Sequence, residues 1–595
     1  MSEAVDTHLL LRAFVDELAR CGVAGAVTSP GSRSTPVVLT LAADGRVPTW
    51  SHIDERSGAF FALGVAKATG RPVVLACTSG TAAANYLPAL MEAREARVPL
   101  VVLTADRPPE LREVGAGQVI DQVKLYGAAA KWFVEVGTHT ADRDRLRWVR
   151  QLACRAFWTA LEGRPGVVHL NWALREPLVL DGELPPDDSG RDDGRPWVSR
   201  PALPDDLAAA VDTLEPIVRT AQRGVLIAGR HERRRPALGP AAAAFAAAAG
   251  WPVLAEPLSG ARRGPNAIAH YDALLRAGAL AAAVRPDVVL RVGDLPTGKP
   301  LREWLAGADA VQVALDAEGA WQDPAATLDL SLPAEPAGTL GALAERLAPG
   351  GRVPVSVSSA EARGHSAPSG YLEGWLHADR LASAQIGVTL GDHLSEPRVA
   401  RELGAALPAD ATLVVSASMP IRDVETFFPV RDDPPRVLSN RGANGIDGVV
   451  STAFGVAAGA AGPVAVLIGD VALAYDVGAL VSARRLRLAL TIVLVDNEGG
   501  GIFDFLPVAR TRPRETYEVH VATPTGLDFA EIAVAFGLRY LPATTVSELR
   551  GAVAAALAHD GVSLVHVHTD RAMNVRLHRR VWSDIEASLT VRRTT

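Results

Sequence analysis

Short, fully apolar segments rich in β-branched residues recur along the chain, and helical patterns separate them. Val464–Ile468 and Thr491–Val495 are two such segments, with a helical stretch between them. Strands without polar alternation are buried on both faces, and their alternation with helices predicts a parallel sheet covered by helices. In such sheets ligands bind beyond the carboxyl ends of the strands. The pattern therefore predicts an α/β protein with its functional residues at those ends.

The alternation occurs in three blocks, which indicates more than one folding unit. We expect three doubly wound parallel-sheet α/β domains, over residues 1–182, 207–349 and 386–595. Two stretches rich in Pro, Gly, Ser and charge, 184–206 and 350–387, are expected to be linkers. A length of 595 residues fits this division, at roughly 100–200 residues per domain.

Apolar runs predict strands, and periodic segments predict helices. Strands are expected over 23–28, 72–77, 99–104, 224–228, 252–255, 287–292, 310–315, 413–416, 464–468, 491–495 and 563–568, and helices over 10–19, 58–68, 82–96 and 241–249.

Composition and charge exclude several functional classes. The net charge of −7 gives no case for nucleic-acid binding. The apolar stretch 449–468 approaches the length of a membrane span, but Gly462-Pro463 divides it into a helix and a strand. The three cysteines form no disulfide framework, and the N-terminus does not read as a signal peptide. We therefore expect a cytoplasmic protein without membrane contact.

Gly469-Asp470 and Asp496-Asn497 follow the two strands 464–468 and 491–495 directly. Asp470 and Asn497 are 497 − 470 = 27 positions apart, enough for one helix and one returning strand. A right-handed crossover would put both at the same sheet edge. Each pair alone is typical of an ordinary turn. Together, a carboxylate and an amide oxygen beside a glycine that permits phosphate approach predict a Mg²⁺–diphosphate site.

Arginines and a glutamate lie next to other strand ends. Glu55 opens the helix 58–68, where an acid is also expected simply because of the helix dipole. Arg33 and Arg107 each closely follow an apolar strand, and arginine grips carboxylates bidentately. Ser418 and Arg422 are four apart, so one helical turn would put them on one face, although a capping serine with a solvated arginine explains them almost equally well.

The Asp470–Asn497 pair resembles the signature of thiamine-diphosphate enzymes, GDG followed by NN. The sequence departs from it at Val471 and at Asp496, where the signature has glycine and asparagine. The resemblance implies thiamine diphosphate with Mg²⁺, or Mn²⁺ in its place, held by Asp470, Asn497 and the Gly499 carbonyl. It also implies that Glu55 bonds to N1′ of the cofactor's pyrimidine.

Five longer strings resemble one family within that group, the 2-succinyl-5-enolpyruvyl-6-hydroxy-3-cyclohexene-1-carboxylate synthases of menaquinone biosynthesis. They are Thr28–Pro36, Thr104–Pro109, Gly115–Gln118, Ser439–Gly448 and Gly499–Pro507. The resemblance covers both outer domains, whereas in the central domain Pro296–Lys299 is the clearest match.

The resemblance implies a transferase (carboligase) that decarboxylates 2-oxoglutarate and adds the remaining succinyl unit to isochorismate. It implies a homodimer or homotetramer with active sites between chains. It places Ser32, Arg33, Arg107, Gln118, Lys299, Ser418, Arg422 and Arg441 around the substrates, and Glu55, Gly80, Ile446, Gly469, Asp470, Asn497, Ile502 and Phe503 around the cofactor, with Leu506 as a further apolar wall.

Two alternatives remain open at this point. One is another carboligase or decarboxylase of the same fold, such as a relative of acetolactate synthase. The other is a non-catalytic binding protein that kept the fold, against which the presence of Glu55, Asp470 and Asn497 argues.

Overall fold

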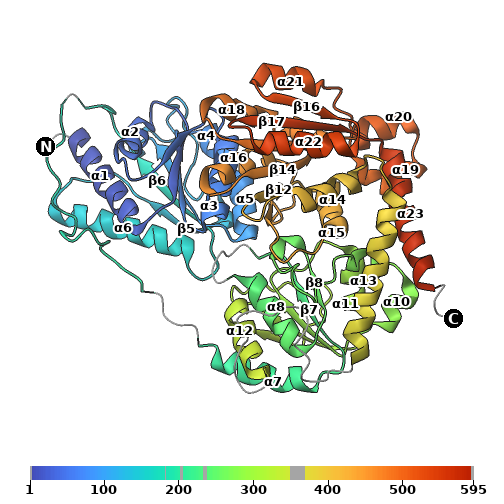
Figure 1. Cartoon of the computed structure of the whole chain (residues 1–595). Coiled ribbons are helices and arrows are strands. Elements are labelled where there is room, and N and C mark those ends of the chain that lie inside the picture. Colours follow the sequence, from blue (N-terminus) through green and yellow to red (C-terminus); the bar gives the residue numbers. More distant parts are fainter. Residues whose placement is uncertain (1–2, 181, 202–205, 232–236, 349–368, 591–595) are drawn as a thin grey trace.

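Three parallel sheets, each covered by helices, build the molecule, which confirms the predicted fold class. The computed structural model describes residues 3–180, 182–201, 206–231, 237–348 and 369–590. Figure 1 shows the first (blue) and third (orange to red) domains side by side, with the central domain (green) beneath them. No helix within these ranges is long and apolar enough to cross a membrane.

The first sheet has six strands in the order β2-β1-β3-β4-β6-β5. Its strands are β1 (Gly25–Thr28), β2 (Thr49–Ser51), β3 (Val73–Cys77), β4 (Leu100–Asp106), β5 (Ala130–Glu135) and β6 (Val167–Ala173), and its helices are α1 (Glu3–Cys21), α2 (Thr35–Ala43), α3 (Glu55–Thr69), α4 (Thr81–Asn85), α5 (Leu87–Ala96) and α6 (Arg143–Leu161). The single helix predicted over 82–96 is wrong. Two helices, α4 and α5, occupy this stretch and are separated at Tyr86, because Pro88 is accommodated in the first turn of α5.

The central sheet has five strands in the order β11-β10-β9-β7-β8, and its four predicted strands are confirmed. The strands are β7 (Gly224–Ala228), β8 (Val253–Ala255), β9 (Val288–Val292), β10 (Val311–Leu315) and β11 (Leu330–Leu332), and the helices are α7 (Ala208–Thr220), α8 (Leu238–Ala249), α9 (Tyr271–Leu274), α10 (Gly278–Ala283), α11 (Lys299–Ala306) and α12 (Pro336–Leu347).

The third sheet has six strands in the order β13-β12-β14-β15-β17-β16. They are β12 (Thr412–Val415), β13 (Arg436–Ser439), β14 (Val464–Gly469), β15 (Leu490–Asp496), β16 (Arg539–Ala543) and β17 (Val562–His568). The helices are α14 (Glu396–Ala406), α15 (Met419–Phe427), α16 (Val449–Gly459), α17 (Asp470–Tyr475), α18 (Val481–Arg485), α19 (Val508–Thr511), α20 (Arg514–Tyr517), α21 (Phe529–Phe536), α22 (Val546–Leu557) and α23 (Arg571–Thr590). Because β14 and β15 are parallel neighbours, the crossover expected between them is confirmed.

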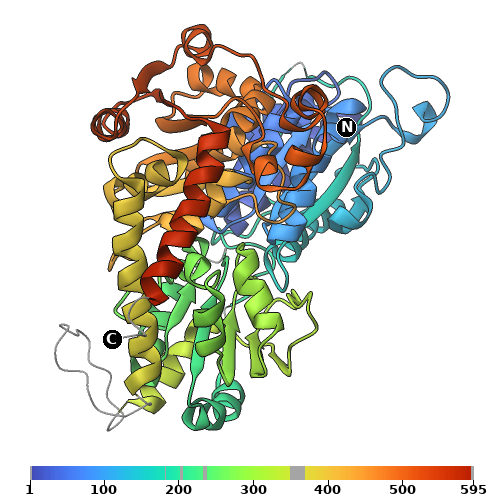
Figure 2. The same cartoon turned by 90° about the vertical axis from the view of Figure 1, so that its right-hand side faces the viewer.

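The linker predicted over 350–387 is wrong from residue 369 onward, where α13 (Ser369–Leu390) begins; residues 350–368 lie outside the described residues. Trp375 and Ala382 of α13 are buried in one apolar cluster with Val581 and Ile585 of α23. Figure 2 shows the two helices (yellow and red) running side by side from the third domain onto the central one. In the other predicted linker, 184–201 contain neither helix nor strand, and 202–205 are not described.

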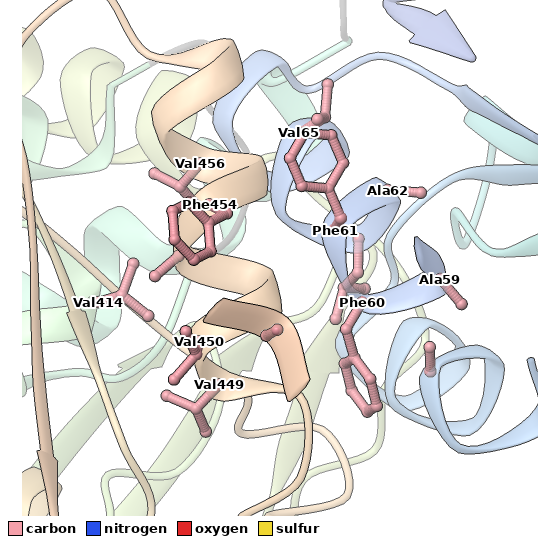
Figure 3. Packing of buried hydrophobic residues seen from close by; sticks show 14 of the residues in the cluster. Ala59, Phe60, Phe61, Ala62, Val65, Val414, Val449, Val450, Phe454 and Val456 are labelled. Carbon is pink, nitrogen blue, oxygen red and sulfur yellow. The ribbon is translucent and has the colours of Figure 1, made fainter. Parts of the chain in front are cut away.

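Helices α3 and α16 join the first and third domains through a tightly packed apolar contact. Figure 3 shows Phe60 and Phe61 of α3 facing the helix that carries Val450 and Phe454. The backbones approach so closely that a Cβ on Gly455 would lie 1.9 Å from the Phe61 carbonyl oxygen. The contact fixes the N-terminus of α3, which carries Glu55, against the third domain.

We expect Gly455→Ala to lower the stability of the α3–α16 contact by about 1–3 kcal/mol, because the added methyl forces the backbones apart. The melting temperature from a thermal shift assay should fall. Gly551→Ala is the matched control, since Gly551 lies in α22 with nothing within 4 Å of its would-be Cβ. An unchanged melting temperature in Gly455→Ala would show that the α3–α16 contact is loosely packed in solution.

Candidate active site

The carboxyl ends of β14 and β15 bring Asp470 and Asn497 to one edge of the third sheet. Gly469 pairs with Val495 across the two strands, so the residues that follow each strand are neighbours. Asp470 is the first residue of α17 and is 2% exposed, and Asn497 is 8% exposed. Both side chains are therefore buried where the sequence predicted a metal–diphosphate site.

One side-chain oxygen of each residue has no hydrogen-bond partner within the described part of the chain. These atoms are Asp470 Oδ2 and Asn497 Oδ1. Asn497 Nδ2 donates to Glu396 Oε1 at 2.8 Å, which fixes the amide and leaves Oδ1 unengaged. Buried polar atoms normally have partners, and oxygens of this kind are the ligands of Mg²⁺. The donor set fits a hard divalent cation.

The electrostatics around Asp470 also favour a bound cation. Burial, and secondarily the charge of Asp496, raises the pKa of Asp470 to about 6, while N–H groups of Val471 and Gly499 oppose the rise. A divalent cation would relieve the cost of this buried charge. Gly499 has φ 135°, and its carbonyl oxygen accepts from the Gly501 N–H at 2.9 Å, which leaves one lone pair for a metal.

The turn at Gly469 leaves open space on the side where a ligand would approach. A Cβ at this position would have only the Val495 carbonyl oxygen nearby, at 4.0 Å. Apart from Gly469 and its two chain neighbours, no other atom of the described residues lies within 4 Å of that position, so a phosphate could approach the backbone there.

Glu55 begins α3, as predicted, and is half-buried. Burial raises the pKa of Glu55 above its usual value, and the charge of Asp54 adds to the rise. The adjacent Arg56 donates to the Tyr475 carbonyl oxygen at 3.2 Å, so the start of α3 lies against the end of α17. Burial and the neighbouring charge therefore both disfavour the ionised form of Glu55.

Five residues of the first domain form one polar cluster near the ends of β3 and β4. Gln118 Nε2 donates to the Ser79 carbonyl oxygen at 2.9 Å, and Arg107 donates to the Ser79 hydroxyl and, at 3.2 Å, to the Gln118 carbonyl oxygen. The Gly80 N–H donates to Gln122 Oε1 at 3.0 Å. The structure thus brings Arg107, Gln118 and Gly80 together, as expected from their motifs.

Arg33 lies close to this cluster but is held by other residues of the first domain. It is 6% exposed and donates to the Leu174 carbonyl oxygen at 3.0 Å and to Glu176 Oε1 at 3.1 Å. Burial lowers the pKa of Arg107, and the charge of Arg33 lowers it further. Two neighbouring guanidinium groups are suited to bind an anion, and Ser32, which precedes Arg33, is exposed.

A second group of cations lies where the third domain meets the central one. Arg422 donates to the Ser418 carbonyl oxygen at 2.6 Å, and Arg441 donates to Thr297 Oγ1 at 3.2 Å. Burial lowers the pKa of Arg441; the carboxylate of Glu256 opposes this, and Arg422 adds to it. The positive charges of Arg422 and Arg441 therefore act on each other, and the two groups form one cationic cluster.

Ser418 is not a helix-capping serine. It precedes α15 with φ 73° and ψ −130°, and its side chain makes no capping hydrogen bond. Pro420 lies in the first turn of α15, where proline is tolerated. A non-glycine residue in this conformation costs about 1–3 kcal/mol, which is typical of functional sites.

Lys299 does not join the cation group. Its side chain is 82% exposed and pairs with Glu303 one turn along α11, at 3.3 Å. Thr297 of the same loop makes the contact with Arg441 instead.

The apolar residues predicted to line the cofactor site are only partly buried by the rest of the protein. Ile446 packs against the large apolar cluster shared by the first and third domains, and Ile502 is half-buried. Phe503 is 38% exposed and Leu506 is 47% exposed. Large apolar side chains left open beside a polar site are suited to contact a ligand or a second protein surface.

The sequence reasoning missed several residues that organise these groups. Ser79 and the buried Gln122 hold the first-domain cluster, and Glu396 orients Asn497. Thr297 contacts Arg441 and donates to Glu256. Ser79 follows a predicted strand, so its position could have singled it out. Thr297 lies in the string Pro296–Lys299, which also could have singled it out, whereas Gln122, Glu256 and Glu396 lie outside any recognised motif.

A cavity of about 980 Å³ lies away from all these residues, between the first and central domains. Arg97, Arg230 and Asp294 are among its lining residues, and none of the predicted site residues lines it. Strand-end geometry, rather than cavity size, therefore locates the candidate site.

Comparison with known proteins agrees with this geometry. Residues 10–125 match the family model described as thiamine pyrophosphate enzyme, N-terminal TPP binding domain, and residues 421–567 match the corresponding C-terminal TPP binding domain. Proteins named 2-succinyl-5-enolpyruvyl-6-hydroxy-3-cyclohexene-1-carboxylate synthase are similar over nearly their full length. Those of Geobacillus kaustophilus (strain HTA426) and Myxococcus xanthus (strain DK1622) are each 42% identical, covering 98% and 99% of this chain and 98% and 99% of their own. That of Halobacterium salinarum (strain ATCC 29341 / DSM 671 / R1) is 41% identical over 96% of this chain and 97% of its own.

Proposed function

Because the chain belongs to the family of 2-succinyl-5-enolpyruvyl-6-hydroxy-3-cyclohexene-1-carboxylate synthases, we propose that it decarboxylates 2-oxoglutarate and adds the succinyl unit to isochorismate. It is a thiamine-diphosphate enzyme, a transferase of menaquinone biosynthesis. The observation that carries the proposal is the similarity over nearly the whole of both chains. The paired unpartnered oxygens of Asp470 and Asn497 support it independently. A cytoplasmic location fits this activity.

Mg²⁺, or Mn²⁺ in its place, would be held by Asp470, Asn497 and the Gly499 carbonyl oxygen. Gly469 would allow the diphosphate to approach the backbone at the same edge. When bound, thiamine diphosphate supplies the electron sink for loss of CO₂. Glu55 would hold a proton in its bond to the pyrimidine N1′, which its burial and raised pKa favour. Ile446, Ile502, Phe503 and Leu506 would exclude water beside it.

The two cation groups suggest a division between the two substrates. Arg33, Arg107 and Gln118, with Ser32 at the edge, would bind isochorismate, and Ser418, Arg422 and Arg441 would bind 2-oxoglutarate. The exposed Lys299 would contribute at the rim. Both substrates are dicarboxylates, so each needs fixed cations, which paired arginines supply.

A homodimer or homotetramer with active sites between chains fits the exposed apolar residues near the site. Ile53 is 64% exposed and Tyr475 is 53% exposed, and they flank Glu55 and the end of α17. Such side chains are commonly covered by another subunit.

A choice between keto acids tests the proposed reaction against an acetolactate-synthase-like activity. The holoenzyme should consume isochorismate rapidly with 2-oxoglutarate and at least about tenfold more slowly, in kcat/KM, with pyruvate. A higher kcat/KM with pyruvate, or product formation from pyruvate in the absence of isochorismate, would support the acetolactate-synthase-like activity.

We expect Arg107→Ala to raise the KM for isochorismate at least about tenfold, because a paired guanidinium is lost. Decarboxylation of 2-oxoglutarate, followed with an artificial electron acceptor, should change little. Arg143→Ala is the control, since Arg143 is an exposed arginine at the start of α6 in the same domain. Equal losses in both steps would contradict the division of substrates.

A further inference from the structure

A group of three metal-binding side chains lies beside the thiamine site but is not part of it. His566 and His568 are two positions apart on β17, so both side chains project from one face of the sheet. Asp496 ends β15 and is the register partner of His568. The ligand atoms of all three residues lie within 4.8 Å of one another.

The distances match those between ligands around a single small cation. His566 Nε2 lies 3.1 Å from Asp496 Oδ2, and His568 Nε2 lies 3.6 Å from the same oxygen. Two ligands bound about 2.0–2.1 Å from a tetrahedral Zn²⁺ are separated by about 3.3 Å. Both measured distances are close to this separation, and the ligand nitrogens of the two histidines lie within 4.8 Å of each other.

Neighbouring groups orient two of the three side chains. The Tyr540 hydroxyl lies 2.9 Å from His566 Nδ1, and Asp496 Oδ1 accepts from the Glu498 N–H at 3.1 Å. An outer hydrogen bond that fixes the second ring nitrogen is a regular feature of histidine metal ligands. His566 and Asp496 are each 6% exposed, while the His568 side chain is 65% exposed, which leaves a path for ion entry from solvent.

A simple Asp–His ion pair would account for one histidine but gives no role to the second. The site also uses the position at which the chain departs from the thiamine signature, since Asp496 stands where the signature has asparagine. The substitution supplies the one anionic ligand among the three. Two imidazoles with one carboxylate favour Zn²⁺ and similar transition metals over Mg²⁺.

We propose that Asp496, His566 and His568 bind a transition-metal ion of the Zn²⁺ class, with water as the fourth ligand. This ion joins the carboxyl ends of β15 and β17. It is separate from the cation proposed at Asp470 and Asn497, because it uses nitrogen ligands on the neighbouring strand.

Cobalt(II) titration of the full-length protein tests the site, since tetrahedral Co²⁺ absorbs far more strongly in the visible range than octahedral Co²⁺. The titration is done with saturating Mg²⁺ and thiamine diphosphate, so that the proposed cofactor site is occupied. The wild type should develop the tetrahedral absorption, and Zn²⁺ should abolish it. Asp470→Asn should retain the tetrahedral absorption, which distinguishes this site from the proposed Mg²⁺ site. The absorption is read without any measurement of activity.

Variants identify the ligands. His568→Ala and His566→Gln should each weaken Co²⁺ binding by more than about 100-fold, and Tyr540→Phe by about 10- to 100-fold, the usual effect of an outer-shell partner. His377→Ala, which removes an exposed imidazole from α13, should bind as the wild type does. Because His568 is exposed, its variant should fold normally, which circular dichroism checks. Wild-type affinity in His568→Ala, or no tetrahedral absorption in the wild type, would overturn the proposal.

Discussion

Asp470→Ala is expected to weaken Mg²⁺-dependent binding of thiamine diphosphate by more than about 100-fold and to abolish activity. The variant removes the one anionic ligand at the point where diphosphate charge gathers, and hard cations depend on such ligands. Calorimetric titration with the cofactor at fixed Mg²⁺ measures the loss directly. Asp560→Ala is the control, because Asp560 is an exposed aspartate in a loop of the same domain.

The fold should survive the substitution. Burial raises the pKa of Asp470 to about 6, so without a cation the native carboxylate costs free energy. The apoprotein of the variant should therefore melt at or above the temperature of the wild-type apoprotein. Undiminished cofactor affinity in a folded Asp470→Ala protein would refute the assignment of the metal–diphosphate site.

Glu55→Gln is expected to slow hydrogen–deuterium exchange at C2 of the bound cofactor by about 100- to 10,000-fold, the usual contribution of a general acid–base group. The amide cannot hold and release a proton at the pyrimidine N1′ as the carboxyl group does. Cofactor affinity should fall little, since Glu55 is absent from the metal–diphosphate site. Glu373→Gln on the exposed side of α13 is the control. Wild-type exchange in Glu55→Gln would assign the proton transfer to another residue.

Much of the fold could be predicted because its central strands are buried on both faces. β14 is apolar throughout and β15 is apolar from Ile492 to Val495, so both were predicted as buried strands. Two edge strands gave no such signal: β2 is short and half-exposed, and β16 contains a proline. Helix α13 follows a polar stretch, and its helical character depends on packing of Trp375 against α23, which no local pattern reveals.

Some residues of the candidate site could likewise be predicted from the sequence, and others could not. Asp470 and Asn497 were predictable, because a strand end is a fixed position in a parallel sheet. Lys299 was placed by its motif, but the direction of its side chain depends on α11, where Glu303 lies one turn away and pairs with it. The contact of Cys21 Sγ with Cys154 Sγ at 3.7 Å likewise depends on how α1 packs on α6, and the sequence spacing does not indicate it.

The reaction itself is tested most directly by mass balance on the holoenzyme. With 2-oxoglutarate labelled at the carboxyl carbon next to the keto group, labelled CO₂ should be released in equal amount to the isochorismate consumed. The single product should carry the remaining carbons of 2-oxoglutarate joined to the isochorismate ring. Release of CO₂ without loss of isochorismate, or loss of isochorismate without 2-oxoglutarate, would contradict the proposed synthase activity.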